Sequence, residues 1–260
     1  MSPTILPFPA GRSIAIDAMQ MTTNGLVCID FLEADVTAPR QTLKAAAQPE
    51  RRPLSFTAYI IACYARALMA HPKIQAFWRF PRQLVVYDEV DVSIILEDKA
   101  ERGIPSPHII RGAQALSVRQ ISEEVRTAQA DPDPFGRKNE RLIPLFAALP
   151  RPLRRLFFQG MRLNPDWIRK IQGTTNVSSV GMFGKGLTWA VGNQSFHSVS
   201  LWVGSIVRKP MNYNGEIALR DCLYLAISFD HAIVDGAPAS RFAATFVELL
   251  ESGSLLEIQN

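Results

Sequence analysis

Cysteine and histidine are scarce in this chain of 260 residues, and their scarcity argues against several kinds of site. The three cysteines, Cys28, Cys63 and Cys222, are far apart and odd in number, which argues against a disulfide framework or a cysteine-based metal site. Only four histidines are present, and no two are spaced three or four residues apart. A histidine-based metal site is therefore not expected, and free thiols suit a reducing, cytoplasmic compartment.

No segment of the sequence signals export or membrane insertion. The N-terminus lacks a basic start followed by an apolar core, so no signal peptide is visible. Residues 186–207 contain no charged side chain and reach the length of a membrane span, but their Asn, Gln, His, Ser and Gly residues favour strand, loop and strand within a soluble domain. The formal net charge of +4 is modest for this length and does not by itself indicate nucleic-acid binding.

Hydrophobic residues make up 47% of the chain, which is enough for a sizeable core. No low-complexity linker divides the sequence, so we expect a single domain over residues 1–260, with a divergent segment at 131–172. Strands are predicted at 26–32, 84–87, 90–96, 176–180, 188–191, 199–207 and 222–229, with 84–87 paired to 90–96, and 109–111 is a further short apolar piece. Helices are predicted at 40–47, 55–69, 117–130 and 238–250, after an extended proline-rich stretch at 1–13. This mixture predicts an α/β or α+β two-layer sandwich, a mixed sheet with flanking helices.

Residues 137–170 differ in composition from the rest of the chain. They contain nine Lys and Arg residues against two acidic residues, interleaved with Leu, Ile and Phe. Such a basic amphipathic stretch can lie on an anionic membrane or bind a partner. A pair of surface helices packed on their own domain gives the same pattern, so both interpretations stay open.

The strongest candidate for chemistry is His231, which follows an apolar strand-like run and precedes Asp235 and Gly236. An imidazole has an unperturbed pKa of ~6.5, which suits proton transfer near neutrality. The residues alone leave three roles open for His231: a structural side chain, a general base or, least favoured, a metal ligand.

Two motifs give the sequence a resemblance to a known family. His231-Ala-Ile-Val-Asp235-Gly236 resembles the His-x-x-x-Asp-Gly signature shared by chloramphenicol acetyltransferases and the catalytic domain of the dihydrolipoyl acyltransferases of 2-oxo-acid dehydrogenase complexes. Residues 173–184, Gly-Thr-Thr-Asn-Val-Ser-Ser-Val-Gly-Met-Phe-Gly, are similar to the acyltransferase segment Gly-Thr-Phe-Thr-Ile-Ser-Asn-Leu-Gly-Met-Phe-Gly. The similarity extends over roughly residues 10–250 and is weakest at 131–172.

The resemblance implies a chloramphenicol acetyltransferase-like fold and CoA-dependent acyl transfer. His231 would then be the general base on the acceptor or the CoA thiol, and Ser178 would stabilise the tetrahedral oxyanion. Asp235 and Gly236 would support the site. Asp235 would form a salt bridge with Arg12, the first arginine of the chain, and Gly236 would permit a tight turn.

The resemblance also implies partners. We expect a homotrimer with the active site at the subunit interface, acyl-CoA as a substrate, and a small-molecule or lipoyl-bearing acceptor. No lipoyl domain precedes the similar region, so a stand-alone form without a covalently bound lipoyl group is expected. Ala232, where the dihydrolipoyl branch has arginine, and the basic segment argue against assembly into a large cubic core. The alternative function is a catalytically silent trimeric scaffold, or a CoA- or lipid-binding module of the same fold, and peripheral membrane contact through 137–170 is a third hypothesis.

Overall fold

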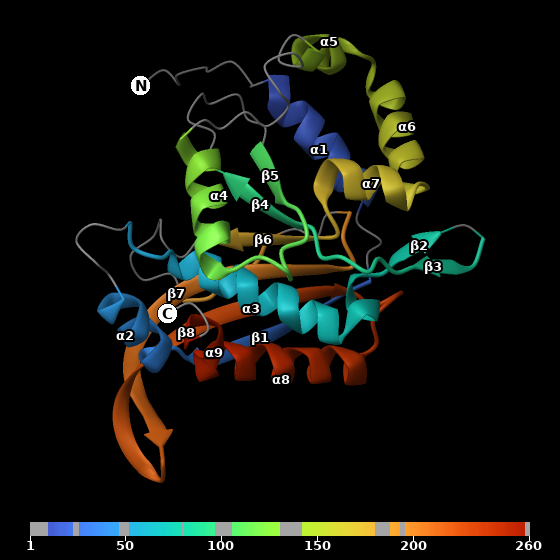
Figure 1. The fold of residues 1–260 in the computed structure, drawn as a ribbon. Helices are drawn as coiled ribbons and strands as arrows, with labels where there is room; N and C mark the ends of the chain where they lie inside the picture. The colour runs from blue at the N-terminus through green and yellow to red at the C-terminus, as the bar shows by residue number, and fades with distance from the viewer. Residues whose placement is uncertain are drawn as a thin grey trace, which may run out of the picture.

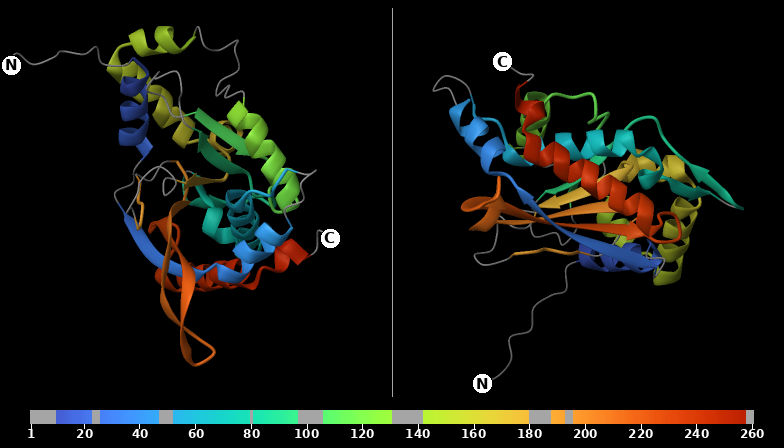
Figure 2. Two further views of the ribbon diagram at one scale, coloured as in Figure 1. Left: turned by 90° about the vertical axis from the view of Figure 1, so that its left-hand side faces the viewer. Right: turned by 90° about the horizontal axis from the view of Figure 1, so that it is seen from below.

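A computed structural model describes residues 10–22, 26–46, 52–79, 81–96, 106–130, 142–179, 188–192 and 196–257. Its centre is a six-stranded mixed sheet in the order β1-β8-β7-β6-β4-β5. These strands are β1 (Val27–Asp35), β4 (Val92–Leu96), β5 (Ser106–Ile110), β6 (Thr175–Ser179), β7 (Val199–Tyr213) and β8 (Glu216–Asp230). Helices α3 (Phe56–Ala70) and α8 (Gly236–Ser252) cover one face of the sheet (Figures 1 and 2). The predicted mixed sheet with flanking helices is confirmed.

Helix α3 is the main apolar layer against the sheet. Ser55 caps its N-terminus by accepting a hydrogen bond from the backbone N–H of Ala58. Ten of its residues are buried, because it packs against the sheet and against helices α8 and α4 (Val118–Ala130). Its one deeply buried polar contact with the sheet joins the hydroxyls of Tyr64 and Thr175 in β6 at 2.8 Å. This contact fixes which side of β6 faces the helices.

Strands β7 and β8 form the longest hairpin of the described chain. Their register closes with Tyr213 opposite Glu216, and the turn residues Asn214 and Gly215 both have positive φ angles, 54° and 87°. Two residues with positive φ match the twist of a hairpin. The hairpin is longer than the strands predicted at 199–207 and 222–229, because its outer arm is exposed and does not read as an apolar run.

A second layer of helices forms around the N-terminal helix. Helix α1 (Ala10–Thr22) packs on α5 (Leu142–Ala148) and α6 (Arg151–Arg162), and α7 (Pro165–Gln172) follows α6. Asp17 is buried here and accepts hydrogen bonds from Nε of Arg151 at 2.9 Å and Nε of Arg154 at 2.8 Å. Burial alone would raise the pKa of Asp17, but these arginines outweigh it and hold the pKa below its ordinary value. Part of the basic segment is therefore neutralised inside the molecule.

The remaining elements correct several predictions. Residues 10–13 are helical, not extended, because the prolines precede α1 and do not interrupt it. The predicted pair 84–87 and 90–96 is wrong: β3 (Gln83–Val85) pairs with β2 (Phe77–Arg79) in a separate small sheet, and β4 lies between β5 and β6. Residues 188–191 are not a strand, and the basic segment holds three helices instead of two. The other described elements are α2 (Thr37–Ala45), η1 (Pro72–Gln75), α4 (Val118–Ala130) and α9 (Ser254–Glu257).

The parts of the chain that the structure describes include no helix long and apolar enough to cross a membrane.

Candidate functional site

The turn that carries His231 is held by backbone hydrogen bonds at the end of β8. The N–H of Ile233 donates to the carbonyl of Asp230 at 2.9 Å, and the N–H of Ala232 donates to Asp230 Oδ1 at 3.0 Å. The N–H of His231 itself donates to the carbonyl of Leu26, next to β1, at 2.7 Å. The His231 side chain is exposed. The backbone position is therefore fixed while the imidazole faces outward, where a substrate or a second chain can reach it.

The structure places the three residues that were expected to support the site: Asp235, Gly236 and Arg12. Asp235 is the N-cap of α8, and its Oδ1 accepts a hydrogen bond from the N–H of Gly236 at 2.8 Å. Gly236 is the first residue of α8, its φ is not positive, and an added Cβ would meet nothing within 4 Å. The geometry at this position therefore does not itself require glycine. Arg12 lies in α1, but its side chain is outside the described part, so its salt bridge with Asp235 stays a prediction.

Ser178 lies in β6 on the sheet face turned away from α3 and α8. Successive residues of a strand point to opposite faces, and Val177 belongs to the core cluster beneath the helices. Asn176 and Ser178 therefore point the other way. Ser178 is only 7% exposed and lies opposite Trp202 of β7.

The face that carries Ser178 also has a row of small polar side chains. Asn176 accepts a hydrogen bond from the hydroxyl of Ser200, and Trp202 Nε1 donates to the hydroxyl of Ser228 at 3.2 Å. The register places Asn176, Ser200 and Ser228 side by side on β6, β7 and β8. Polar groups are thus concentrated in the middle of the sheet on the side opposite α3 and α8.

Ser178 and His231 do not meet within one chain. Ser178 is opposite Trp202, Trp202 is opposite Ala226, and His231 follows Ala226 by five residues. Neighbouring strands lie ~4.8 Å apart and each residue advances ~3.3 Å, so the two Cα atoms are roughly 20 Å apart. A single chain cannot place both side chains on one reacting carbonyl.

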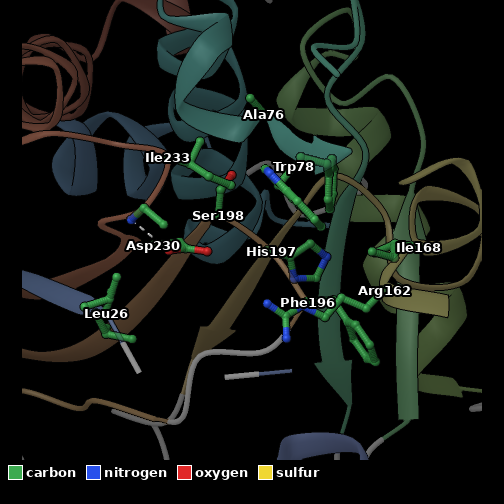
Figure 3. A pocket seen from close by; sticks show the side chains of 13 residues that line it. Leu26, Ala76, Trp78, Arg162, Ile168, Phe196, His197, Ser198, Asp230 and Ile233 are labelled. Atoms are coloured by element: carbon green, nitrogen blue, oxygen red, sulfur yellow. Dashed lines mark hydrogen bonds between the residues drawn. The ribbon is translucent and has the colours of Figure 1, made fainter. Parts of the chain in front are cut away.

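A cavity of about 330 Å³ borders the His231 turn (Figure 3). Asp230, Ala232 and Ile233 form one side of it, so the backbone on both sides of His231 contributes to the wall. Its other lining residues come from separate parts of the chain: Leu26, Val27, Ala76, Phe77, Trp78, Arg162, Ile168, Phe196, His197 and Ser198. Sequence reasoning missed this cavity because no local motif links these positions.

His197 is the most perturbed titratable group of the cavity. Its side chain is 2% exposed, and its Nε2 lies 2.9 Å from the carbonyl oxygen of Gln172. Burial lowers the pKa of His197 to about 4, so the imidazole is neutral at pH 7. Within the described ranges, no three His, Cys, Asp or Glu side chains gather closely enough to hold a metal ion.

Comparison with known proteins places this chain in a family. The family model for the 2-oxoacid dehydrogenases acyltransferase (catalytic domain) matches residues 6–131 and 162–258. The succinyltransferase component of the 2-oxoglutarate dehydrogenase complex of Haemophilus influenzae is 25% identical over 207 residues, 79% of this chain and 42% of that protein. The lipoamide acyltransferase component of the branched-chain alpha-keto acid dehydrogenase complex of Bacillus subtilis is 25% identical over 227 residues, 85% of this chain and 46% of that protein. The chain thus spans less than half the length of these relatives.

Solved structures agree on the fold. A probable dihydrolipoamide acetyltransferase from Listeria monocytogenes 4b F2365 superposes with a TM-score of 0.74 at 20% identity, covering 96% of this chain and 95% of that one. A chloramphenicol acetyltransferase superposes with a TM-score of 0.53 at 17% identity, covering 94% and 96%. The family model leaves out residues 132–161, which include α5 and nearly all of α6, and matches almost everything else. The chain belongs to the family of 2-oxoacid dehydrogenase acyltransferase catalytic domains and has their chloramphenicol acetyltransferase-like fold.

Proposed function

We propose that the chain is an acyltransferase that moves an acyl group between coenzyme A and a thiol, hydroxyl or amine acceptor. The observation that carries the proposal is the exposed His231 on a rigid turn within a chain of this family. His231 takes the proton from the attacking thiol, hydroxyl or amine, because the deprotonated form is the stronger nucleophile. The nucleophile then adds to the acyl carbonyl, and the resulting oxyanion accepts a hydrogen bond from Ser178. Collapse of this intermediate expels the leaving group, which takes the proton back from the imidazole.

The separation of roughly 20 Å within one chain supports a site shared between two copies in a homotrimer. The sheet face that carries Ser178 also has exposed apolar side chains on β1, which a second copy would cover. Ile29 is 39% exposed and Phe31 is 57% exposed, and the register puts them on the same face as Ser228 and Ala226. In this arrangement His231 of one copy and Ser178 of its neighbour act on the same carbonyl.

A solved relative supports the choice of residues. The Azotobacter vinelandii dihydrolipoamide acetyltransferase was investigated for the role of a serine, a histidine and an asparagine in its catalytic mechanism. In that protein the asparagine follows the histidine by four residues, as Asp235 follows His231 here. Its serine precedes the histidine by about fifty residues, which is also the spacing of Ser178 from His231. The match in type and spacing supports His231 and Ser178 as the catalytic residues.

The proposal is tested by measuring coenzyme A release from a set of acyl-CoAs with thiol, hydroxyl and amine acceptors. His231→Ala is expected to lower turnover by roughly 10²- to 10⁴-fold, and Ser178→Ala by roughly 10²- to 10³-fold. His108→Ala is the matched control, since His108 lies on β5 and contacts Glu124. Unchanged turnover in the His231→Ala protein would refute the mechanism.

The shared site has its own test. Co-expression of the His231→Ala and Ser178→Ala chains in random mixed trimers recreates an intact pair at about one interface in four. Activity is therefore expected to return to roughly a quarter of the wild-type value, although each variant alone is inactive. Mixed trimers that stay as inactive as the single variants would contradict a site between subunits.

The identity of the acyl acceptor is tested separately. The names of the relatives refer to dihydrolipoyllysine residues, so a lipoyl group carried by another protein is the first acceptor to try. Turnover with free dihydrolipoamide and with a lipoylated domain, compared with small thiols and alcohols, separates the two classes. A preference for the lipoylated domain above tenfold would identify a partner protein.

A second candidate function is a catalytically silent module that binds coenzyme A or lipid. It predicts coenzyme A binding by calorimetry with no turnover of any acyl-CoA. The observation that favours a lipid contact is a set of exposed leucines on and beside α5 and α6: Leu145, Leu153, Leu156 and Leu163 are 65%, 52%, 64% and 55% exposed. The absence of salt-sensitive co-sedimentation with anionic liposomes would eliminate this contact.

A further inference from the structure

The cavity beside the His231 turn has a mostly apolar lining with one cationic side chain. Trp78, Ile168 and Phe196 provide flat apolar surface, and Arg162, the last residue of α6, extends along the lower wall in Figure 3. Its volume of about 330 Å³ is at the small end of ligand pockets. A whole coenzyme A molecule, with its nucleotide and its long arm, does not fit in such a space. The cavity therefore suits a small molecule or one end of a larger one.

Arg162 differs from the other arginines of the basic helices. Arg154 donates to Asp17 and Arg169 donates to Asp91. The half-buried Arg162 guanidinium, in contrast, donates no hydrogen bond and forms no ion pair with any residue that the structure describes. A guanidinium has five N–H donors and recognises carboxylates in a two-pronged geometry. Arg162 thus has an unused binding capacity directed at a cavity.

Two further titratable side chains line the cavity, His197 and Asp230. His197 is neutral because burial lowers its pKa to about 4. Asp230 belongs to the wall at the His231 turn, where its Oδ1 accepts a hydrogen bond from the N–H of Ala232. The arrangement suits a ligand with a carboxylate at the Arg162 end and an uncharged or hydrogen-bond-donating end toward the turn.

We propose that this cavity binds the carboxylate-bearing part of a small acyl-transfer substrate, with Arg162 as the residue that selects for the carboxylate. The apolar body of the substrate packs on Trp78 and Phe196, and its reacting end is directed toward the His231 turn. The proposal rests on the proposed acyl transfer and names its substrate class. The carboxylate belongs either to the acceptor, as in a hydroxy, thiol or amino acid, or to the far end of a dicarboxylic acyl group.

Direct binding tests the site without turnover. Acetate, succinate and 3-phenylpropionate, each compared with its neutral amide, are titrated into the full chain by calorimetry. At least one acid is expected to bind tenfold or more tightly than its amide. Arg162→Met should weaken the binding of that acid by roughly 10- to 100-fold, as for loss of a hydrogen bond to a charged group, and remove its preference over the amide. Arg162→Lys should retain part of the preference for the acid over the amide.

Arg241→Met is the matched control, because it removes the same charge from the exposed surface of α8. Circular dichroism melting curves check that each variant is folded. The proposal is overturned if no acid binds in preference to its amide, or if Arg162→Met binds the acid as tightly as wild type.

Kinetics distinguishes the two sources of the carboxylate. Succinyl-CoA is compared with butyryl-CoA at a fixed uncharged acceptor, and acceptors with and without a carboxylate are compared at a fixed acetyl-CoA concentration. Arg162→Met should raise KM at least tenfold only for the substrate that carries the carboxylate. Equal effects on charged and uncharged substrates would overturn a role in specificity.

Failure of this site is distinguishable from failure of the proposed acyl transfer. His231→Ala should abolish turnover and leave acid binding unchanged. A fully active His231→Ala protein refutes the acyl-transfer mechanism but leaves the Arg162 binding result intact. Normal acid binding by Arg162→Met refutes the site but leaves the role of His231 intact.

Discussion

The buried imidazole of His197 predicts a specific loss of stability in mild acid. His197 is 2% exposed, contacts the carbonyl oxygen of Gln172, and lies 6.4 Å from the ring of Phe77. Burial lowers its pKa to about 4 in the folded chain, whereas an unfolded histidine has a pKa of ~6.5. The perturbation that isolates this effect is His197→Gln, because glutamine keeps an N–H donor for Gln172 but does not titrate.

The direction and magnitude follow from linkage between protonation and folding. Above pH ~6.5 the imidazole is neutral in both states, so stability is complete. As the pH falls from ~6.5 to ~4, the unfolded chain gains a proton that the folded chain does not, and the free energy of unfolding decreases. A difference of ~2.5 pKa units at 1.36 kcal/mol each amounts to about 3 kcal/mol. The carboxyls of Asp17 and Asp91, whose pKa values lie below the ordinary value, titrate below this range.

Urea unfolding followed by circular dichroism at pH 7, 6, 5 and 4 measures this loss. Wild type should lose about 3 kcal/mol more than His197→Gln between pH 7 and pH 4. His108→Gln, which changes a partly exposed histidine on β5, serves as the control and should follow the wild-type curve more closely. Identical pH dependence in wild type and His197→Gln would refute the link between burial of His197 and acid sensitivity.

Three further variants test the packing around the site, each by urea unfolding at pH 7. Asp17→Asn should lower stability by about 3–5 kcal/mol because it leaves the buried Arg154 without a counter-charge; a loss no larger than that of the exposed Asp88→Asn would contradict this. Gly204→Ala should cost about 1–3 kcal/mol, since its Cβ would lie 2.2 Å from a backbone oxygen, whereas Gly160→Ala, with open space around it, should not destabilise. Asp235→Ala should cost about 1 kcal/mol by removing the cap of α8, and Asp235→Asn should not.

The sequence predicted the helices and strands whose buried positions and ends can be recognised from neighbouring residues. Helix α3 spans Phe56–Ala70 where a helix is predicted at 55–69, and α8 spans Gly236–Ser252 where a helix is predicted at 238–250. The inner half of β8 is buried and reads as an apolar run. In such segments the pattern of apolar residues follows directly from which side chains are buried. Hydrophobic periodicity is therefore sufficient to predict the helix or strand.

Elements stabilised by distant partners were not predictable in the same way. Residues 84–87 have a strand-like composition, but composition does not specify which neighbour they pair with, and β3 pairs with β2. Helix α1 was hidden by the prolines before it, and its burial depends on α6, more than a hundred residues later. The sequence predicted His231 and Ser178 only through a family resemblance, and it gave no sign of the cavity. The 13 residues that line the cavity come from stretches of chain that are far apart in sequence, between Leu26 and Ile233, and only the fold brings them together.

The division between predictable and unpredictable residues coincides with the division between their proposed roles. His231 and Ser178 depend on strand ends and strand faces, which the common sheet of the family provides, and both lie within the ranges that the family model matches. Arg162 stands at the first residue after the unmatched segment 132–161, at the end of α6, whose position depends on the contact with α1. A shift or deletion of α6 would therefore move the cation of the cavity without disturbing the His231 turn. For this reason we expect changes within 142–161 to alter the choice of substrate, seen as KM, before they alter the rate of the chemical step.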